Sequence, residues 1–259
     1  VHLMEPHDPY FEYPLNGVGY GRAEHEHPDP EDKDYLIETY KGEISEMDDQ
    51  LGQFFEWMKT EGLYDNTVIL LTSDHGEEFY EHGGWWHGTT LYDEQIHVPL
   101  VVKPPGNTHA GTVIDWQVRN IDVAPTLAAA MGIEPDPSWA GTDLIAGVEA
   151  YKADELHRQE ALTTEWLASF PEGTEPGPDD VPPTLDDEDD PCVPSAFERL
   201  VIAEEDFEGN VIGAIRKSGM KLIRANEGNP RGLPTEALFD LGADPEEQDN
   251  LAGTSRQVC

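Results

Sequence analysis

The sequence has few basic residues. Its 259 residues include 15 Lys and Arg against 54 Asp and Glu, which gives a formal net charge of −39 at pH 7. Because so anionic a surface repels phosphate, the composition excludes binding of nucleic acid through the overall field and disfavours adhesion to anionic membranes. Such a charge is common in disordered chains, but 37% hydrophobic residues and 6 Trp favour a folded one. We expect an acidic surface typical of the cytoplasm of an organism living at high salt, with an ordinary acidic enzyme as the alternative.

Cysteine and long apolar runs are scarce as well. Cys192 and Cys259 are the 2 cysteines, which excludes a disulfide framework and a cysteine-based metal site. No apolar run reaches the roughly 18 residues that a transmembrane helix needs. The chain opens on a strand-like apolar stretch without a signal peptide, so we expect that the natural amino terminus lies upstream. No pattern indicates an oligomeric state.

The clearest expected element is a long helix ending near Gly62, because its apolar residues recur at spacings of three and four. They are Leu36, Tyr40, Ile44, Met47, Leu51, Phe54, Phe55 and Met58. A continuous apolar run at 67–72 predicts a strand covered on both faces, and a helix leading into such a strand indicates an α/β unit with a parallel sheet. Strands are also expected at 1–4, 96–102, 113–118, 161–164 and 236–240, a helix at 122–131, a hairpin at 211–216 and 220–225, and a helical turn at 244–251.

The strongest chemical signal directly follows the strand at 67–72, in Thr-Ser-Asp-His-Gly-Glu at 72–77. In α/β sheets, ligands bind just past the carboxyl ends of strands. Asp74 and His75 there offer a carboxylate oxygen and an imidazole nitrogen to one divalent cation, although the dipeptide taken alone favours a capping Asp and a loop His.

Histidines gather around this signal. Four of the 10 histidines lie at 75–97: His75, His82, His87 and His97. Two more, His2 and His7, lie near the start of the chain. Histidines on several loops suit a phosphate- or sulfate-ester site, which needs donors for the non-bridging oxygens and an acid for the leaving alkoxide.

Several motifs occur in a characteristic order. They are Pro-His-Asp-Pro-Tyr at 6–10, Asp-Asn-Thr at 65–67, the signal at 72–77, Glu-His-Gly at 81–83, His-Gly-Thr-Thr-Leu-Tyr-Asp-Glu at 87–94, Ile-His-Val-Pro-Leu at 96–100 and Arg-Asn-Ile-Asp-Val-Ala-Pro-Thr-Leu at 119–127, followed by segments at 221–224, 238–241 and 244–251. Together they resemble the sulfatase family of the alkaline phosphatase superfamily. The resemblance implies an α/β fold: an alkaline phosphatase-like three-layer sandwich with a mostly parallel central sheet and a small antiparallel carboxyl-terminal subdomain.

An acidic stretch sets the expected domain boundaries. Residues 171–191 carry no base, and their acids are Glu172, Glu175, Asp179, Asp180, Asp186, Asp187, Glu188, Asp189 and Asp190. Such a composition predicts a solvated linker or long loop. We therefore expect the carboxyl-terminal portion of a sulfatase-like catalytic α/β domain at 1–170, an acidic linker or loop at 171–192, and a small α+β subdomain at 193–259.

The resemblance assigns roles to four residues. Asp74 and His75 match metal ligands, with calcium (Ca2+) as the expected ion. Zinc or manganese, used by related phospho-transferring enzymes, is the alternative because histidine is an unusual ligand for calcium. His7 matches the histidine that contacts the ester and protonates the leaving oxygen. His87 stands where many sulfatases have a lysine before Gly-Thr-Thr, so it is expected as a pH-dependent cationic contact to the substrate.

Other side chains near the motifs carry weaker expectations. Trp86 either lines the substrate pocket or packs over the metal loop. Glu77 and His82 are expected to support the ligands from behind, with a simple turn residue as the alternative for His82. Four bases on the expected hairpin either face solvent or form an anion-binding edge: Arg216, Lys217, Lys221 and Arg224.

One element of the resemblance is missing. The family's nucleophile motif, Cys or Ser-x-Pro-x-Arg, does not precede His7, and neither does a first pair of acidic ligands. Cys-Val-Pro-Ser-Ala at 192–196 lacks the arginine and is interpreted as coincidence. We therefore expect the carboxyl-terminal part of an enzyme, inactive alone, with a formylglycine-type nucleophile upstream.

The expected function is metal-dependent hydrolysis of a small-molecule or carbohydrate sulfate ester. One alternative is a phosphodiesterase, phosphonate monoester hydrolase or phosphoethanolamine-type transferase of the same superfamily. An alternative from another class is a non-catalytic acidic binding domain.

Overall fold

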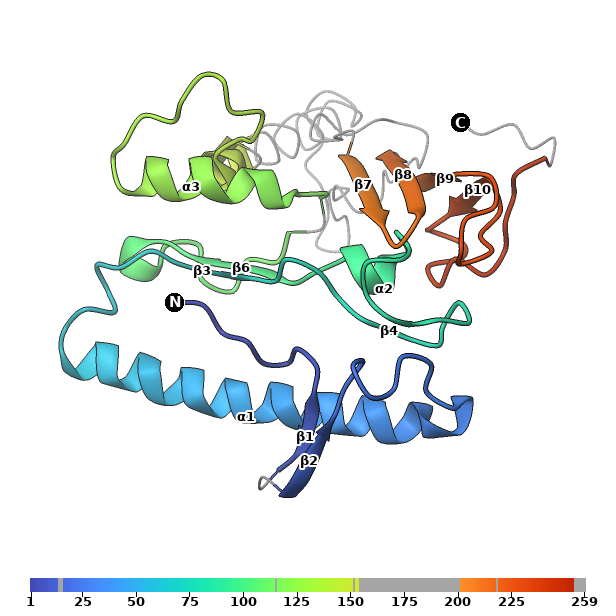
Figure 1. Ribbon diagram of the computed structural model, residues 1–259. Helices are drawn as coiled ribbons and strands as arrows, with labels where there is room; N and C mark the ends of the chain where they lie inside the picture. The colour runs from blue at the N-terminus through green and yellow to red at the C-terminus, as the bar shows by residue number, and fades with distance from the viewer. Residues whose placement is uncertain (14–15, 115, 151, 154–200, 218, 254–259) are drawn as a thin grey trace, which may run out of the picture. The chain divides into compact units, whose positions relative to one another are not determined.

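The computed structural model describes residues 1–13, 16–114, 116–150, 152–153, 201–217 and 219–253 (Figure 1). The chain forms two compact units, one of Val1–Gly111 with Leu200–Thr254 and one of Thr112–Arg199 with Ser255–Cys259. The acidic stretch at 171–191, the strand expected at 161–164, both cysteines and the expected domain boundaries lie outside the described residues. None of the described helices is long and apolar enough to cross a membrane.

The long helix of the first unit is confirmed as α1 (Lys33–Thr60). It follows η1 (Pro30–Asp32), whose first turn is capped by the Asp29 carboxylate accepting from Glu31 N. After the helix, Gly62 takes a positive φ of 69°, the left-handed conformation that commonly ends helices. Leu36 and Met58 are buried at either end of the helix, whereas Ile44 and Phe54 of the expected apolar stripe are 38% and 39% exposed.

Two strands lead to the candidate site. β3 (Ile69–Thr72) pairs antiparallel with β6 (Leu100–Lys103), so that Thr72 lies opposite Leu100. The strand expected at 96–102 begins only at 100, because α2 (Asp93–Ile96) takes up the earlier residues and Pro99 has no N–H to donate to a ladder. β6 is followed by η2 (Pro105–Asn107). Asp74 and His75 therefore follow the carboxyl end of β3, as predicted.

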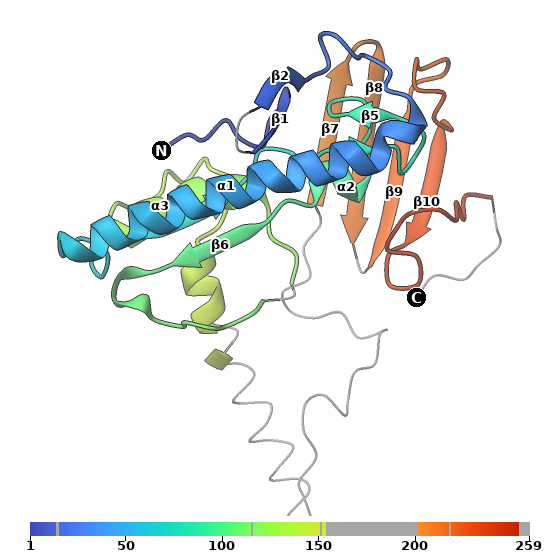
Figure 2. The ribbon, with the colours of Figure 1, turned by 90° about the horizontal axis from the view of Figure 1, so that it is seen from below.

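Two short hairpins were not predicted. β1 (Tyr10–Glu12) pairs with β2 (Asn16–Tyr20), and β4 (Glu78–Phe79) pairs with β5 (Trp85–Trp86). Figure 2 shows the first hairpin beside α1. The strand expected at 1–4 is wrong, because that segment has no strand partner among the described residues and Val1 is fully exposed. The hairpins and α1 share a small core of Tyr10, Leu36, Phe79, Trp85 and Trp86.

The Glu43 carboxylate fastens the first hairpin to α1. Its Oε1 accepts from Phe11 N at 2.8 Å, while its Oε2 has no partner among the described residues. Burial raises the pKa of Glu43 to about 7, the Phe11 N–H opposes this rise, and the charges of Glu5 and Asp8 add to it. The buried position therefore favours the protonated form of the Glu43 carboxyl over its charged form.

The raised pKa makes part of the stability depend on pH. Glu43 binds its proton more tightly in the folded state than in the unfolded state, so its contribution is fully present below about pH 4 and is lost as pH rises through about 7. We expect Glu43→Gln to raise stability at pH 8 by about 1–3 kcal/mol and to change it little at pH 4. Thermal unfolding at both pH values measures this, with exposed Asp49→Asn on the same helix as control. An equal effect at both pH values would contradict it.

The carboxyl-terminal residues of the first unit form one antiparallel sheet in the order β10-β9-β8-β7. Its strands are β7 (Val201–Phe207), β8 (Asn210–Lys217), β9 (Met220–Ala225) and β10 (Glu236–Asp240). The predicted hairpin and final strand are confirmed, β7 is additional, and 244–251 forms turns in place of the expected helical turn. The buried core on this sheet consists of Leu91, Tyr92, Ile212, Ala214, Ile223, Ala237, Phe239 and Leu241. The sheet therefore packs against the segment that follows His87.

The expectation that hairpin bases face solvent is wrong for Lys221. It is fully buried, with Nζ 2.7 Å from Asp93 Oδ1 and 2.9 Å from Glu247 Oε1. The reason is the two-residue period of a strand, which places Lys221 on the same buried face as Ile223.

The second unit contains η3 (Asn120–Asp122) and α3 (Val123–Ala130), which confirm the helix expected at 122–131. The Asp122 carboxylate, at the start of this helix, accepts from Arg119 N at 3.0 Å and Thr142 N at 2.9 Å, which ties together the segments on either side. The described residues of 113–118 form no strand, so that expectation is wrong; Val113 is 90% exposed and has no apolar face to pack on.

Candidate active site

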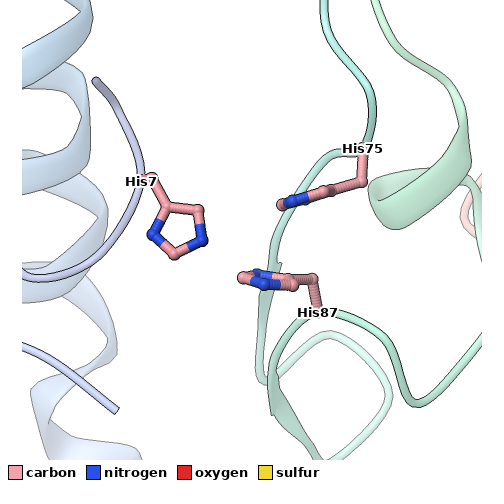
Figure 3. A group of neighbouring side chains, drawn as sticks. All are labelled: His7, His75 and His87. Carbon is pink, nitrogen blue, oxygen red and sulfur yellow. The ribbon is translucent and has the colours of Figure 1, made fainter. Parts of the chain in front are cut away.

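Three histidines from three loops of the first unit meet at one place (Figure 3). His7, His75 and His87 each offer one ring nitrogen, and these atoms lie within 4.8 Å of one another. The rings of His75 and His87 are stacked with centroids 4.0 Å apart, and His7 lies edge-on to His87 at 5.1 Å. Such a group can hold a cation between imidazoles or surround a tetrahedral anion with N–H donors.

The protein holds each of these rings through Nδ1. His7 Nδ1 lies 2.8 Å from the Asp8 carbonyl oxygen and His75 Nδ1 lies 2.8 Å from the Gly76 carbonyl oxygen. His87 Nδ1 lies 3.0 Å from Glu77 Oε1. A carbonyl or carboxylate oxygen only accepts, so Nδ1 carries the hydrogen in all three rings. The three Nε2 atoms are therefore left for chemistry.

The donors after β3 fit a divalent metal. His75, with Nδ1 as donor, keeps the Nε2 lone pair that a metal requires, and a carbonyl behind the ring is a common way to fix this tautomer. Asp74 Oδ1 lies 3.9 Å from His75 Nε2, and the Asp74 side chain is 88% exposed. Both groups can therefore reach one ion, although Asp74 does not belong to the three-histidine group.

Glu77 and Tyr10 hold the His87 imidazole. Glu77 Oε1 accepts from His87, and its Oε2 accepts from the Tyr10 hydroxyl at 2.5 Å. The hydrogen bond to Glu77 raises the pKa of His87, against the opposing effect of burial. Burial, reinforced by Glu77, raises the pKa of Tyr10, so this phenol stays a donor. Glu77 therefore lies directly behind the His87 imidazole and favours its protonated form.

Arg22 links the loops of His7 and His87 and was not predicted. Its backbone N donates to Asp8 Oδ2 at 2.8 Å, next to His7. Its guanidinium lies 3.5 Å from the His87 carbonyl oxygen and donates to Glu208 at 2.9 Å. No motif pointed to it, because its partners come from three distant segments.

Two residues with weaker expectations lie away from the cluster. His82 stacks on Tyr92 with centroids 3.6 Å apart, and its Nδ1 lies 2.6 Å from Glu94 Oε1. Trp86 is 3% exposed, and its indole N–H donates to Glu26 O at 3.1 Å. Both side chains are therefore held by packing and hydrogen bonds within the first unit, and neither belongs to the three-histidine group.

Comparison with known proteins finds a matching family model and several relatives by sequence. The family model "Sulfatase" matches residues 1–133. The multifunctional alkaline phosphatase superfamily protein PehA of Trinickia caryophylli is 39% identical over 111 residues, covering 41% of this chain and 21% of that protein. The choline-sulfatase of Rhizobium meliloti is 27% identical over 218 residues, covering 84% of this chain and 33% of that protein. The chain thus spans a third or less of these relatives.

Solved structures show the same fold. A putative sulfatase from Bacteroides thetaiotaomicron superposes with a TM-score of 0.62 at 19% identity, covering 90% of this chain and 42% of that one. A protein solved in complex with its substrate D-glucosamine-2-N,6-O-disulfate superposes with a TM-score of 0.58 at 21% identity, covering 85% of this chain and 37% of that one. The predicted alkaline phosphatase-like α/β fold with an antiparallel carboxyl-terminal sheet is confirmed. The parallel pairing expected for the strand at 67–72 is not seen in the described residues, where β3 pairs antiparallel with β6.

Proposed function

This chain belongs to the sulfatase family, and from that premise we propose that its three-histidine group takes part in metal-dependent hydrolysis of sulfate esters. The convergence of His7, His75 and His87 past the carboxyl end of β3 carries the proposal. An ester site needs a metal, donors for the non-bridging oxygens and an acid for the leaving group, and this geometry offers a residue for each.

Asp74 and His75 hold the metal in this proposal. When bound, a divalent ion polarises the ester and offsets the charge that develops on its oxygens. Calcium is the ion that the family resemblance suggests, whereas the imidazole donors favour zinc or manganese. The formylglycine-type nucleophile is assigned to no residue of this chain, because no Cys or Ser-x-Pro-x-Arg motif occurs in its sequence.

His87 and His7 act on the ester itself. His87, held by the Glu77 carboxylate, donates from Nε2 to a non-bridging oxygen. His7 acts as the imidazolium, with Nδ1–H donating to the Asp8 carbonyl and lying 3.3 Å from Asp8 Oδ1, and it gives its Nε2 proton to the leaving oxygen and becomes neutral. Trp86 is proposed to act only indirectly, by packing against Tyr10 beneath these rings.

The relatives leave more than one class of ester open. One is a choline-sulfatase and another is a multifunctional member of the alkaline phosphatase superfamily, so phosphate or phosphonate ester hydrolysis is the second candidate. The sulfated sugar bound by a protein of the same fold supports a carbohydrate sulfate as substrate.

Paired aryl sulfate and aryl phosphate esters distinguish the candidates. The full-length protein, loaded with calcium, zinc or manganese in turn, is assayed against both in several molar KCl, the medium that suits so acidic a chain. Faster turnover of the sulfate ester is expected. A preference for the phosphate ester would replace the first candidate by the second, and no turnover with any ion would favour the non-catalytic alternative.

A further inference from the structure

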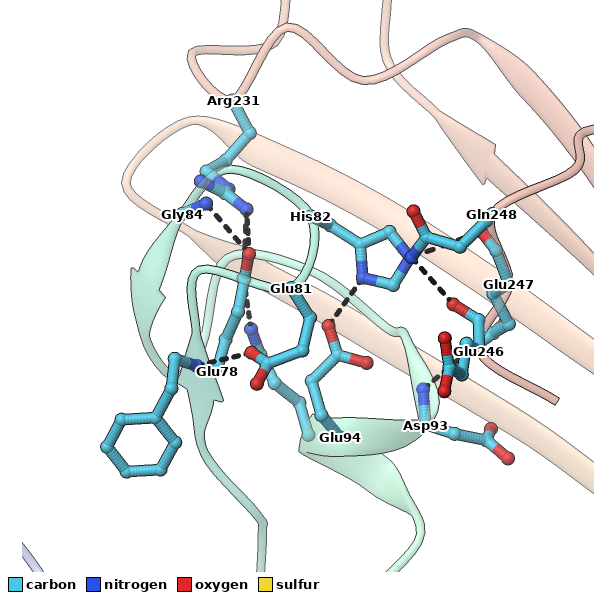
Figure 4. Close-up of polar contacts among 12 residues, drawn as sticks. Glu78, Glu81, His82, Gly84, Asp93, Glu94, Arg231, Glu246, Glu247 and Gln248 are labelled. Carbon is cyan, nitrogen blue, oxygen red and sulfur yellow. Dashed lines mark hydrogen bonds and ion pairs between the residues drawn. The ribbon is translucent and has the colours of Figure 1, made fainter. Parts of the chain in front are cut away.

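Glu78, the neighbour of Glu77, forms the centre of a second buried network (Figure 4). Its side chain is fully buried at the start of β4. Arg231 Nη2 donates to both of its carboxylate oxygens at 2.8 Å, and Gly84 N donates to Oε1 at 2.9 Å. None of these groups has a role in the reaction proposed above.

Gln95 connects this carboxylate to the residue after His87. Its Nε2 donates to Glu78 Oε2 at 3.1 Å, and its Oε1 accepts from Gly88 N at 3.0 Å. The amide has only one workable orientation, because a flipped amide would turn its oxygen to the carboxylate and its NH2 to the Gly88 N–H. Gln95 is 3% exposed, so water does not compete for these bonds.

The carboxyl-terminal sheet fixes Arg231. This residue lies between β9 and β10, and its backbone N donates to the side-chain oxygen of buried Asn210 on β8. Its guanidinium lies against Gly84, where an added Cβ would overlap Nη1 and Cζ of Arg231. Any residue larger than glycine at position 84 would therefore displace the guanidinium from Glu78.

We propose that Arg231 is a positioning residue that sets the place of His87 through Glu78 and Gln95. The two adjacent glutamates then have separate roles, since Glu77 holds the His87 ring and Glu78 holds the backbone immediately after it. The proposal rests on the proposed function only for its kinetic consequence, since a contact made in the transition state depends on placement to a fraction of an ångström.

Protection of the Gly88 amide tests the connection without reference to activity. Hydrogen–deuterium exchange of the full-length protein is followed by mass spectrometry in the peptide that covers Gly88. We expect roughly five- to tenfold faster exchange there in Arg231→Gln and in Gln95→Met, and a smaller increase in Arg231→Lys, which keeps the charge but loses the planar fork. Arg224→Gln is the matched control, because Arg224 lies in the same sheet with its side chain 70% exposed.

Two exchange results overturn the proposal. One is unchanged exchange at Gly88 in both Arg231→Gln and Gln95→Met. The other is an equal increase across all peptides, which would show a general loss of stability only. Either result leaves the ester hydrolysis assay untouched, so the two proposals fail separately.

A double-mutant cycle supplies the kinetic readout once turnover is measured. Arg231→Gln is expected to lower kcat/KM in the wild-type background by roughly tenfold and to have almost no further effect in a His87→Gln background, since the two residues act through one contact. Equal losses in both backgrounds would show that Arg231 does not act through His87.

Discussion

His7→Gln is expected to slow hydrolysis of esters with poor leaving groups by roughly 10²–10⁴-fold, the usual range for loss of a general acid. Esters with good leaving groups should lose much less, because a stable phenolate departs without a proton. The Asp8 carbonyl 2.8 Å from His7 Nδ1 fixes the ring, so only Nε2 can deliver the proton. The measurement is kcat/KM of the metal-loaded full-length protein across a series of sulfate esters from 4-nitrophenyl to alkyl.

A second role for His7 gives a different pattern. The same nitrogen lies close enough to those of His75 and His87 to serve as a third metal ligand. In that case His7→Gln lowers metal content, and activity falls by the same factor for every leaving group. Metal analysis of the purified variant separates the two roles. His25→Gln is the control, because His25 is exposed and stacks on Tyr20 away from the cluster.

The meeting of His7, His75 and His87 could be predicted because each lies in a short motif that resembles the sulfatase family. Tyr10 lies in the first of these motifs, yet its role could not be predicted. Its hydroxyl reaches Glu77, 67 positions away, and this pairing depends on the packing of Tyr10 against Phe79 and Trp86. Hydrogen bonds between loops follow from tertiary packing, which local patterns do not specify.

Long secondary-structure elements could likewise be predicted from the sequence, whereas very short ones could not. The helix α1 and the β8–β9 hairpin extend over enough residues for their apolar period to stand out. β4 and β5 have two residues each, too few for a period, and exist only because they pair with each other. Conversely, apolar residues at 1–4 and 113–118 imitate strands without having a partner strand in the described residues.

The burial of Lys221 is the exception, because alternation along β9 could have revealed it. A lysine that lies on the same buried strand face as an isoleucine needs acidic partners in the core, because an unpaired buried charge is costly. Here they are Asp93, at the start of α2, and Glu247, in the turn after β10. The presence of Lys221 thus required two partners that the chain supplies from distant segments.

Lys221→Met should lower the free energy of unfolding by about 3–5 kcal/mol, the usual cost of removing one partner from a buried ion pair. Methionine fills a similar volume, so the loss comes chiefly from Glu247, which is left buried without its cation, while Asp93 keeps Arg216 at 2.9 Å. Lys221 lowers the pKa of Asp93 against the opposing effect of burial. The loss should therefore shrink in acid, where both carboxylates take up protons.

Denaturant unfolding of the full-length protein at neutral and acidic pH measures this effect. Lys217→Met, an exposed lysine on the adjoining strand, is the matched control and should change stability by less than about 0.5 kcal/mol. Adding Asp93→Asn and Glu247→Gln to Lys221→Met should restore much of the loss, because neutral amides cost less to bury. If this triple variant were no more stable than Lys221→Met alone, the packing of the lysine stem would account for the loss, and the carboxylates that join α2 to the sheet would contribute little.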